Sequence, residues 1–171
     1  MKIKLVFAFV LLTTSVFKMS AQEISFDFED GNKRIWTKAK EVFMVTNEKA
    51  VSGKSSLKYN VTELPANEKE NFQLFLGGNE NVKWSSGTYI ISLKFMADEN
   101  LKATGFNINV MKPFAAANFK INKVEKGKWI DLSQELVIAE DSERLSLSVS
   151  GNPKWGGTGT FYVDDIKIVK K

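Results

Sequence analysis

The 171-residue chain contains no histidine and no cysteine. This composition excludes Ser–His–Asp triads, thiol catalysis, disulfide bonds and zinc sites built from histidine or thiolate. The net charge is +4, from 24 basic and 20 acidic residues, and three of the lysines lie in the first 22 residues. Without these three, 21 basic residues remain and the net charge is +1. A chain this close to neutral gives no electrostatic reason to expect a nucleic-acid partner or an anionic membrane surface.

The first 22 residues are typical of a secretory signal peptide. Lys2 and Lys4 precede an apolar stretch from Leu5 to Leu12, and small residues around Ala21 offer a cleavage site. An N-terminal membrane anchor is the alternative, but the stretch is shorter than the roughly 20 apolar residues that cross a bilayer. A lipoprotein anchor is excluded because it needs a cysteine. We therefore expect residues 23–171 to be a single secreted or periplasmic domain without membrane insertion.

Apolar and polar residues alternate with period 2 along residues 23–171, and Gly, Asn, Asp and Pro separate the alternating runs. No window shows a sustained helical period. The pattern predicts an all-β fold, an antiparallel β-sandwich of about nine strands. The nine expected strands span residues 23–29, 41–47, 55–62, 71–77, 88–97, 105–112, 128–138, 144–150 and 160–169.

Several of these strands carry short polar side chains on one face. Ser146 and Ser148 alternate with apolar residues in strand 144–150, as do Asn107 and Asn109 in strand 105–112 and Gln73 in strand 71–77. Short amides and hydroxyls suit a shallow groove for a hydroxyl-rich ligand. An ordinary solvated sheet face is the alternative.

The last expected strand holds two adjacent carboxylates, Asp164 and Asp165. Strict alternation groups Asp164 with Tyr162, Ile166 and Ile168 on the more apolar face, so we expect Asp164 to point inward. A buried carboxylate is normally protonated, ion-paired or bound to a metal, because leaving it without a partner is costly. Asp164 therefore needs a partner.

Four segments together resemble one known family: FDFEDGN (26–32) followed by Trp36, VSGKSSLKYNV (51–61), KWIDLSQELVI (128–138) and FYVDDIKIV (161–169). They are similar to the galactose-binding-like jelly-roll modules, in particular to the carbohydrate-binding modules attached to xylanases and glucanases. The resemblance covers nearly all of residues 23–171. It implies a jelly-roll sandwich that binds a polysaccharide or oligosaccharide without catalysis.

The resemblance also implies a structural calcium ion between the first and last strands. Carried over by motif, its ligands would be Glu29, Asp164 and backbone oxygens of the loop 47–54, and Asp27 is a further candidate because it shares a strand face with Glu29. Calcium takes six to eight oxygen ligands, which carboxylates and carbonyls can supply. The alternative is that Asp164 accepts hydrogen bonds from backbone amides or pairs with a lysine.

The four tryptophans divide into two pairs. Trp36 and Trp129 lie where the resembled family keeps core tryptophans, so we expect both to be structural. Trp84 and Trp155 lie in turn-rich segments, where an exposed ring can stack on a sugar. The expected ligand contacts are Trp155, Trp84, Asn107, Asn109 and Gln73.

The sequence predicts no catalytic residue. Its acids pair mostly as sequence neighbours, whose side chains diverge on a strand, and a glycosidase needs two carboxylates that face each other. Two hypotheses remain: a secreted binding protein for a neutral polysaccharide, with a calcium site, and a structural or adhesive sandwich that contacts another protein. A groove lined by Trp155, asparagines and serines would support the first, and a flat apolar patch the second.

Overall fold

The computed structural model describes residues 23–64, 71–78, 82–152 and 154–171. The expected signal peptide, residues 1–22, lies outside the described residues and stays a prediction. In the described part of the chain, no helix is long and apolar enough to cross a membrane.

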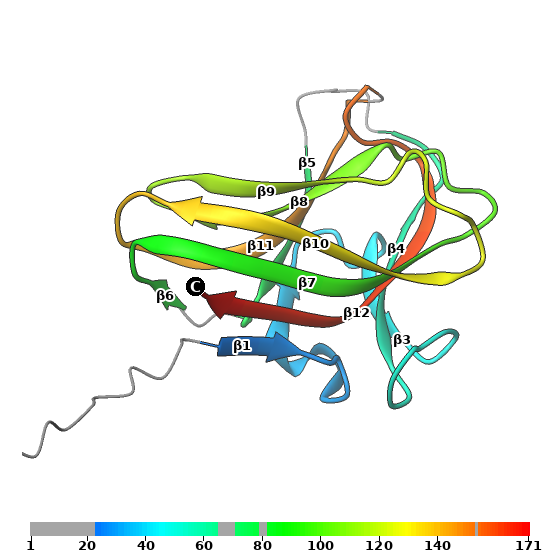
Figure 1. Ribbon diagram of the computed structural model, residues 1–171. Helices are drawn as coiled ribbons and strands as arrows, with labels where there is room; N and C mark the ends of the chain where they lie inside the picture. The colour runs from blue at the N-terminus through cyan, green and yellow to red at the C-terminus, as the bar shows by residue number, and fades with distance from the viewer. Residues whose placement is uncertain (1–22, 65–70, 79–81, 153) are drawn as a thin grey trace, which may run out of the picture.

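Two antiparallel sheets form a β-sandwich (Figure 1). Sheet A has the order β10-β7-β12-β4-β3, with β1 paired to β12, and sheet B has the order β2-β5-β11-β8-β9, with β6 paired to β11. The strands are β1 (Glu23–Phe26), β2 (Ile35–Thr37), β3 (Phe43–Thr46), β4 (Ser56–Val61), β5 (Asn71–Leu76), β6 (Lys83–Trp84), β7 (Gly87–Ala97), β8 (Gly105–Met111), β9 (Ala115–Lys120), β10 (Trp129–Ile138), β11 (Ser142–Ser150) and β12 (Gly159–Lys170), and a 3-10 helix, η1 (Gly31–Arg34), follows β1.

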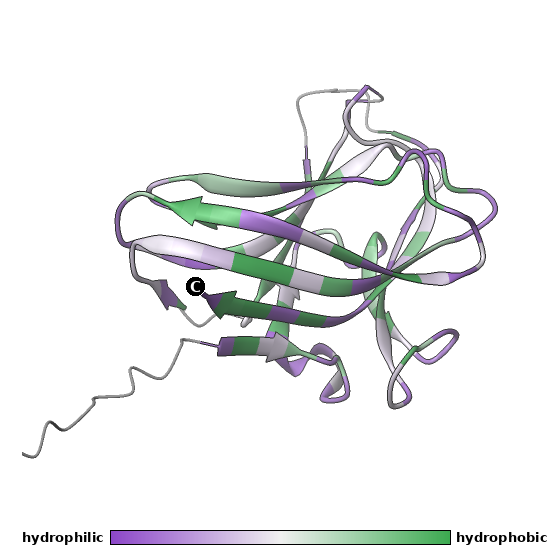
Figure 2. Cartoon of the chain, in the orientation of Figure 1, coloured by the Kyte–Doolittle hydropathy of each residue, from purple (hydrophilic) through white to green (hydrophobic). Residues whose placement is uncertain are grey.

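The core lies between the two sheets and is built from every second residue of the long strands, an alternation visible along β7 and β12 in Figure 2. Aromatic rings join the sheets at its centre: Phe106 of sheet B stacks near Phe161 of sheet A, with ring centroids 5.6 Å apart, and Phe161 stacks on Tyr59 at 4.6 Å. Each fully buried Leu, Ile or Phe side chain contributes about 1.5–3 kcal/mol, so the alternation itself stabilises the sandwich.

All nine expected strands are present, which confirms the all-β antiparallel sandwich. Three strands were not predicted: β2, β6 and β9. Strands β2 and β6 are too short to show alternation. In β9, Ala117 and Phe119 face the core while the intervening positions are Ala116 and Asn118, so small alanines conceal the period.

The expected inward orientation of Asp164 is wrong, because the pairing of β12 with β7 shifts between Asp164 and Lys167. Asp165 takes a left-handed φ of 48° at this bulge. Before the bulge Phe161 and Val163 face the core; after it Ile166 and Ile168 do. An extra residue thus resets the period, and Asp164 leaves β12 on the outer side, where a loop and not the core covers it.

Candidate functional site

Aligned rows of short polar side chains cross the outer face of sheet B. Neighbouring strands place Asn118, Asn107, Ser148 and Gln73 directly opposite one another, on β9, β8, β11 and β5. The next row holds Ala116, Asn109, Ser146, Phe75 and Trp36, on β9, β8, β11, β5 and β2. Each strand buries the residues between these positions, so the same alternation that builds the core builds this face.

Hydrogen bonds between the rows fix the polar groups in place. Ser146 Oγ accepts from Gln73 Nε2 at 3.0 Å and from Asn109 Nδ2 at 2.9 Å, and Ser148 Oγ donates to Asn109 Oδ1 at 3.0 Å. Asn109 is only 2% exposed. The expectation that Asn109 contacts a ligand directly is therefore corrected: it lies beneath the surface and positions Ser146 and Ser148, while the half-buried Gln73 and Asn107 remain accessible.

A hollow of about 520 Å³ lies at the β8–β9 side of this face and is called the Trp155 hollow here. Its lining includes Asn107, Asn118, Ser148 and the ring of Trp155, which is 65% exposed. Asn152 O accepts hydrogen bonds from the backbone N–H groups of Trp155 and Gly156, at 3.0 and 2.9 Å. A tight turn thus presents the indole outward.

Gly156 shows why this turn needs glycine. A Cβ at this position would overlap the carbonyl oxygen of Ser150, the last residue of β11. On its other side, Gly156 O accepts from Thr104 N at 2.9 Å, just before β8 begins. The loop is therefore pressed between two strands of sheet B, and Trp155 stands at the rim of the hollow.

A second hollow, of about 390 Å³, lies at the β2–β5 side of the same face and is called the Trp36 hollow. Trp36 and Phe75 line it with ring centroids 5.5 Å apart, and the Arg144 guanidinium lies 5.7 Å from the Phe75 centroid. Trp36 is 39% exposed. The expectation of a core Trp36 is corrected, because β2 is an edge strand and turns this ring to the outer face.

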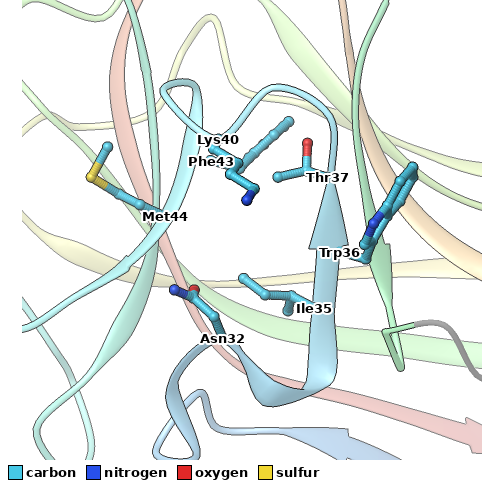
Figure 3. A pocket seen from close by; sticks show the side chains of 7 residues that line it. All are labelled: Asn32, Ile35, Trp36, Thr37, Lys40, Phe43 and Met44. Carbon is cyan, nitrogen blue, oxygen red and sulfur yellow. The ribbon is translucent and has the colours of Figure 1, made fainter.

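A third hollow, of about 320 Å³, opens between the edge strands β2 and β3 (Figure 3). Ile35 and Trp36 leave β2 on opposite sides, so Ile35 enters this hollow together with Phe43 and Met44. Asn32 and Lys40 add polar atoms. The hollow is mostly apolar and differs from the two hollows on the face of sheet B.

The structure places Trp84 in the core and not at the surface. The side chain is 1% exposed and packs edge-on against Tyr89, with ring centroids 5.4 Å apart and an interplanar angle of 80°. Pairing of β6 with β11 holds it there. The expectation of a ligand contact at Trp84 is therefore wrong; the turn-rich segment folds its ring over the end of the core.

The three carboxylates expected to bind calcium all accept backbone hydrogen bonds. Asp164 Oδ2 accepts from Val51 N at 3.0 Å and Ser52 N at 3.3 Å, and its Oδ1 accepts from Asp165 N at 2.8 Å. Asp164 is fully buried beneath this loop, and burial raises its pKa although these three hydrogen bonds act in the opposite direction.

Glu29, which follows β1, contacts the next part of the same loop, where its Oε1 accepts from the backbone N–H groups of Lys54 and Ser55, at 2.9 and 2.8 Å. Asp27 Oδ1 accepts from Glu29 N at 3.2 Å within its own turn. Glu29 and Asp164 therefore hold one loop by its amides, which matches the amide alternative for Asp164.

This arrangement does not fit a calcium ion. Calcium needs six to eight oxygen ligands, and here the loop directs N–H donors toward both carboxylates. No group of three or more acids in the described ranges is placed to hold a metal ion. Calcium binding stays a prediction from resemblance.

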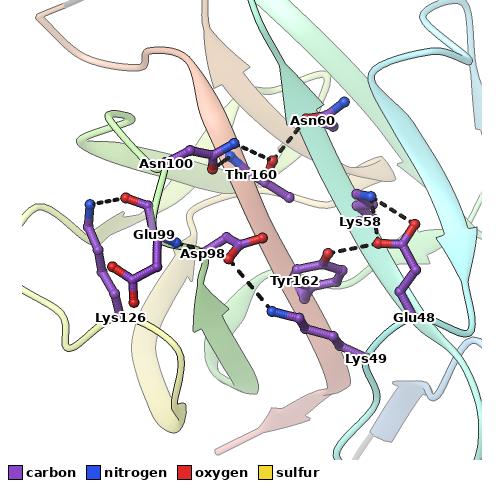
Figure 4. Close-up of polar contacts among 10 residues, drawn as sticks. All are labelled: Glu48, Lys49, Lys58, Asn60, Asp98, Glu99, Asn100, Lys126, Thr160 and Tyr162. Atoms are coloured by element: carbon purple, nitrogen blue, oxygen red, sulfur yellow. Dashed lines mark hydrogen bonds and ion pairs between the residues drawn. The ribbon is translucent and has the colours of Figure 1, made fainter.

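The outer face of sheet A carries a different polar cluster (Figure 4). Tyr162 donates to Glu48 Oε2 at 3.0 Å, Lys58 pairs with Glu48 at 2.7 Å, and Lys49 pairs with Asp98 at 3.6 Å. The hydrogen bond from Lys58 is the main cause that lowers the pKa of Glu48, while burial is the main cause that raises the pKa of Tyr162. These groups satisfy one another, which is typical of a structural cluster.

Comparison with known proteins finds no matching protein-family model and no matching curated protein. Solved structures do match. The CBM22-2 xylan-binding domain of Xyn10C from Paenibacillus barcinonensis is 19% identical, with a TM-score of 0.58 over 86% of this chain and 99% of that one. The CBM27-1 module from Caldicellulosiruptor saccharolyticus, solved in complex with mannohexaose, is 14% identical, with a TM-score of 0.59 over 86% and 97% of the two chains.

The C-terminal CBM6 module of LamC, a marine laminarinase from Zobellia galactanivorans, is 14% identical, with a TM-score of 0.51 over 87% of this chain and 100% of that one. At these identities the likeness concerns the fold. It confirms that this chain has the jelly-roll β-sandwich fold of carbohydrate-binding modules, as the resemblance of its motifs implied.

Proposed function

We propose that this protein is a non-catalytic carbohydrate-binding domain whose ligand lies across the outer face of sheet B. The observation that carries the proposal is the placement of two exposed indoles, Trp36 and Trp155, on either side of preorganised rows of amides and hydroxyls. From β2 to β9 these rows span roughly 19 Å, at about 4.8 Å per strand, which is room for an oligosaccharide.

The chemistry of the face suits a sugar. An exposed indole offers a flat apolar surface to the C–H face of a sugar ring, and amide groups such as Asn107 and Gln73 can both donate to and accept from hydroxyls. The bonds through Ser146 and Asn109 hold Gln73 and Ser148 in place before a ligand arrives, which lowers the entropic cost of binding.

The structural neighbours support the same class of ligand. One is a xylan-binding domain and another was solved with mannohexaose. The non-catalytic part of the proposal rests on two observations: the chain contains no histidine or cysteine, and no acidic residue of the described chain lines either hollow on the face of sheet B. Glycoside hydrolysis needs two facing carboxylates.

Affinity electrophoresis through gels that contain xylan, glucomannan or laminarin tests the proposal. We expect retardation, with a Kd on the order of micromolar to millimolar. Trp155→Ala should abolish it and Trp36→Ala should weaken it, with almost unchanged melting temperatures because both rings are exposed. Phe114→Ala is the matched control, since this exposed ring lies in the turn at the other end of the β8–β9 hairpin.

If the wild-type protein migrates as fast in every gel that contains a neutral or charged glycan as in a gel without glycan, the proposal is refuted. Unfolding of Trp155→Ala would show that the ring belongs to the core. Either result would favour the alternative that the protein binds another protein. The observation that favours that alternative is the apolar hollow lined by Ile35, Phe43 and Met44, and a Met44→Lys variant would then lose the protein partner.

We also propose that the protein is exported and that its leader is cleaved near Ala21 or Gln22. The support is the order of charged, apolar and small residues in the first 22 positions. Intact mass of the exported form tests it, and a mass that retains residues 1–21 would restore the membrane-anchor alternative.

A further inference from the structure

Basic side chains line both hollows on the outer face of sheet B. Lys38 and Arg144 line the Trp36 hollow, and Lys120 and Lys154 line the Trp155 hollow. Within the described part of the chain, no Asp or Glu lines either one. Each hollow thus combines one exposed indole with two cationic groups.

Elsewhere on the described surface seven lysines form ion pairs with acids, while others, such as Lys102 and Lys123, form none. On sheet A, for example, Lys94 pairs with Asp131 at 2.8 Å and Lys167 with Glu23 at 2.7 Å. Lys38, Lys120 and Lys154 form no ion pair with any described residue. Without its first 22 residues the chain has a net charge of only +1, yet three unpaired lysines line the two hollows of this face.

The position of Lys154 links this charge to the stacking surface. Its ammonium lies 4.9 Å from the centroid of the Trp155 ring. An exposed contact of this kind is weak, so the ammonium can move to an anionic group on a sugar that stacks beside it. Lys120 enters the same hollow from β9, so a charged substituent there would have two cationic partners.

We propose that the ligand of this face is an acidic polysaccharide, one whose sugars carry carboxylate or sulfate groups. This proposal rests on the proposed carbohydrate-binding function and replaces the neutral ligand expected from sequence. Unpaired cations around a groove attract a ligand of opposite charge and disfavour the binding of other cationic groups. The rows of amides and the two indoles on either side of them together recognise the sugar, which a purely electrostatic surface would not do.

The test compares polymers that differ only in charge. Polygalacturonate is set against its highly methyl-esterified form, and dextran sulfate against dextran, by affinity electrophoresis and calorimetry with the chain from residue 23. We expect an acidic member to bind at least about tenfold more tightly than its neutral partner at low salt, and this advantage to shrink as salt is added. The pair that shows the advantage distinguishes carboxylate from sulfate.

A double variant locates the effect. Lys120→Gln with Lys154→Gln should weaken binding of the acidic polymer about 2- to 25-fold, from roughly 1.5- to 5-fold per exposed charge, and weaken any binding of the neutral partner by a smaller factor. Lys167→Gln removes the same charge from sheet A and should have no effect on binding.

Three outcomes would overturn the proposal. Equal binding of acidic and neutral partners, lost together in Trp155→Ala, would leave carbohydrate binding intact and remove the acidic preference. Equal weakening by Lys167→Gln, or equally tight binding of single-stranded DNA, would show charge attraction without recognition of a sugar. Absence of binding to all four polymers and to the neutral glycans of the gel experiment would refute both proposals.

Discussion

The two outer faces of the sandwich are built by the same alternation but use their polar groups differently. On sheet A, Tyr162 is covered by Glu48, Lys49 and Lys58, and its hydroxyl donates to one of them. On sheet B, the indoles of Trp36 and Trp155 are exposed, and the neighbouring lysines have no acidic partner among the described residues.

The two faces differ in whether their polar groups already have partners within the chain. Polar groups on sheet A are paired within the chain, so their loss should change stability. Polar groups on sheet B are positioned by hydrogen bonds but keep capacity for further partners, so their loss should change binding. The same backbone pattern thus carries a face whose polar groups stabilise the fold and a face that we propose binds a ligand.

Tyr162→Ala should give the largest loss of stability, because it removes the ring against which Lys49 and Lys58 pack on sheet A. Removal of this buried ring should lower the free energy of unfolding by about 3 kcal/mol, since large-to-small changes of aromatic residues cost about 3–5 kcal/mol and one side of this ring packs against lysine side chains. Chemical denaturation measures the loss. Glycan retardation of the folded variant should equal that of the wild type, and its loss would mean that the two faces are not separate.

Tyr162→Phe is the milder companion. It keeps the ring and removes only the hydrogen bond to Glu48, so about 1 kcal/mol should be lost. A loss as large as that of the alanine variant would assign the stabilisation to the hydroxyl and not to packing.

Asp164→Asn should have an intermediate effect on the loop that covers sheet A. An amide cannot accept all three backbone hydrogen bonds, so we expect a loss of about 1–3 kcal/mol in the free energy of unfolding. The pKa of Asp164 is raised by burial, so between the unfolded and folded pKa values the folded chain binds more protons. Stability from this group is therefore greatest below the unfolded pKa and decreases as pH rises through the folded pKa.

Denaturation of both proteins across the acidic range tests this sign. Asparagine does not titrate, so the stability difference between wild type and variant should shrink as pH rises through that window. A difference that grows with pH would mean that the hydrogen bonds from Val51 and Ser52 outweigh burial.

Calcium should have the smallest effect, because the loop presents amides to Glu29 and Asp164. Thermal melts in excess chelator and in millimolar calcium are expected to have the same midpoint. A higher midpoint in calcium would show that the loop can turn carbonyl oxygens toward these carboxylates, and it would support the calcium site that the family resemblance implies.

The fold was predictable because period-2 alternation is a direct record of burial. All nine expected strands are present, and the alternation in strands β8 and β11 also placed Asn107 and Ser148 on a common outer side. Strand β9 was missed because its alanines carry little contrast in hydrophobicity. Asp164 was predicted on the wrong side of β12 because a bulge adds one residue to the strand, and composition does not reveal a bulge.

The candidate site was only partly predictable, because exposure of a ring depends on its neighbours in space. Trp84 and Trp155 both lie in turn-rich segments, yet β6 pairing buries the first and the Gly156 turn exposes the second. Trp36 was assigned to the core from the family resemblance, whereas β2 is an edge strand that turns the ring outward. The sorting of lysines into paired and unpaired sets is a property of the folded surface and has no counterpart in the linear order of charges.

The place of β12 in sheet A also governs how the chain can assemble during synthesis. This strand lies between β7 and β4 and also pairs with β1, yet it comes last along the chain. A ribosome therefore releases all other strands of sheet A before the strand that joins them exists. Closure of such distant partners is slow, so we expect sheet A to stay open until β12 has emerged.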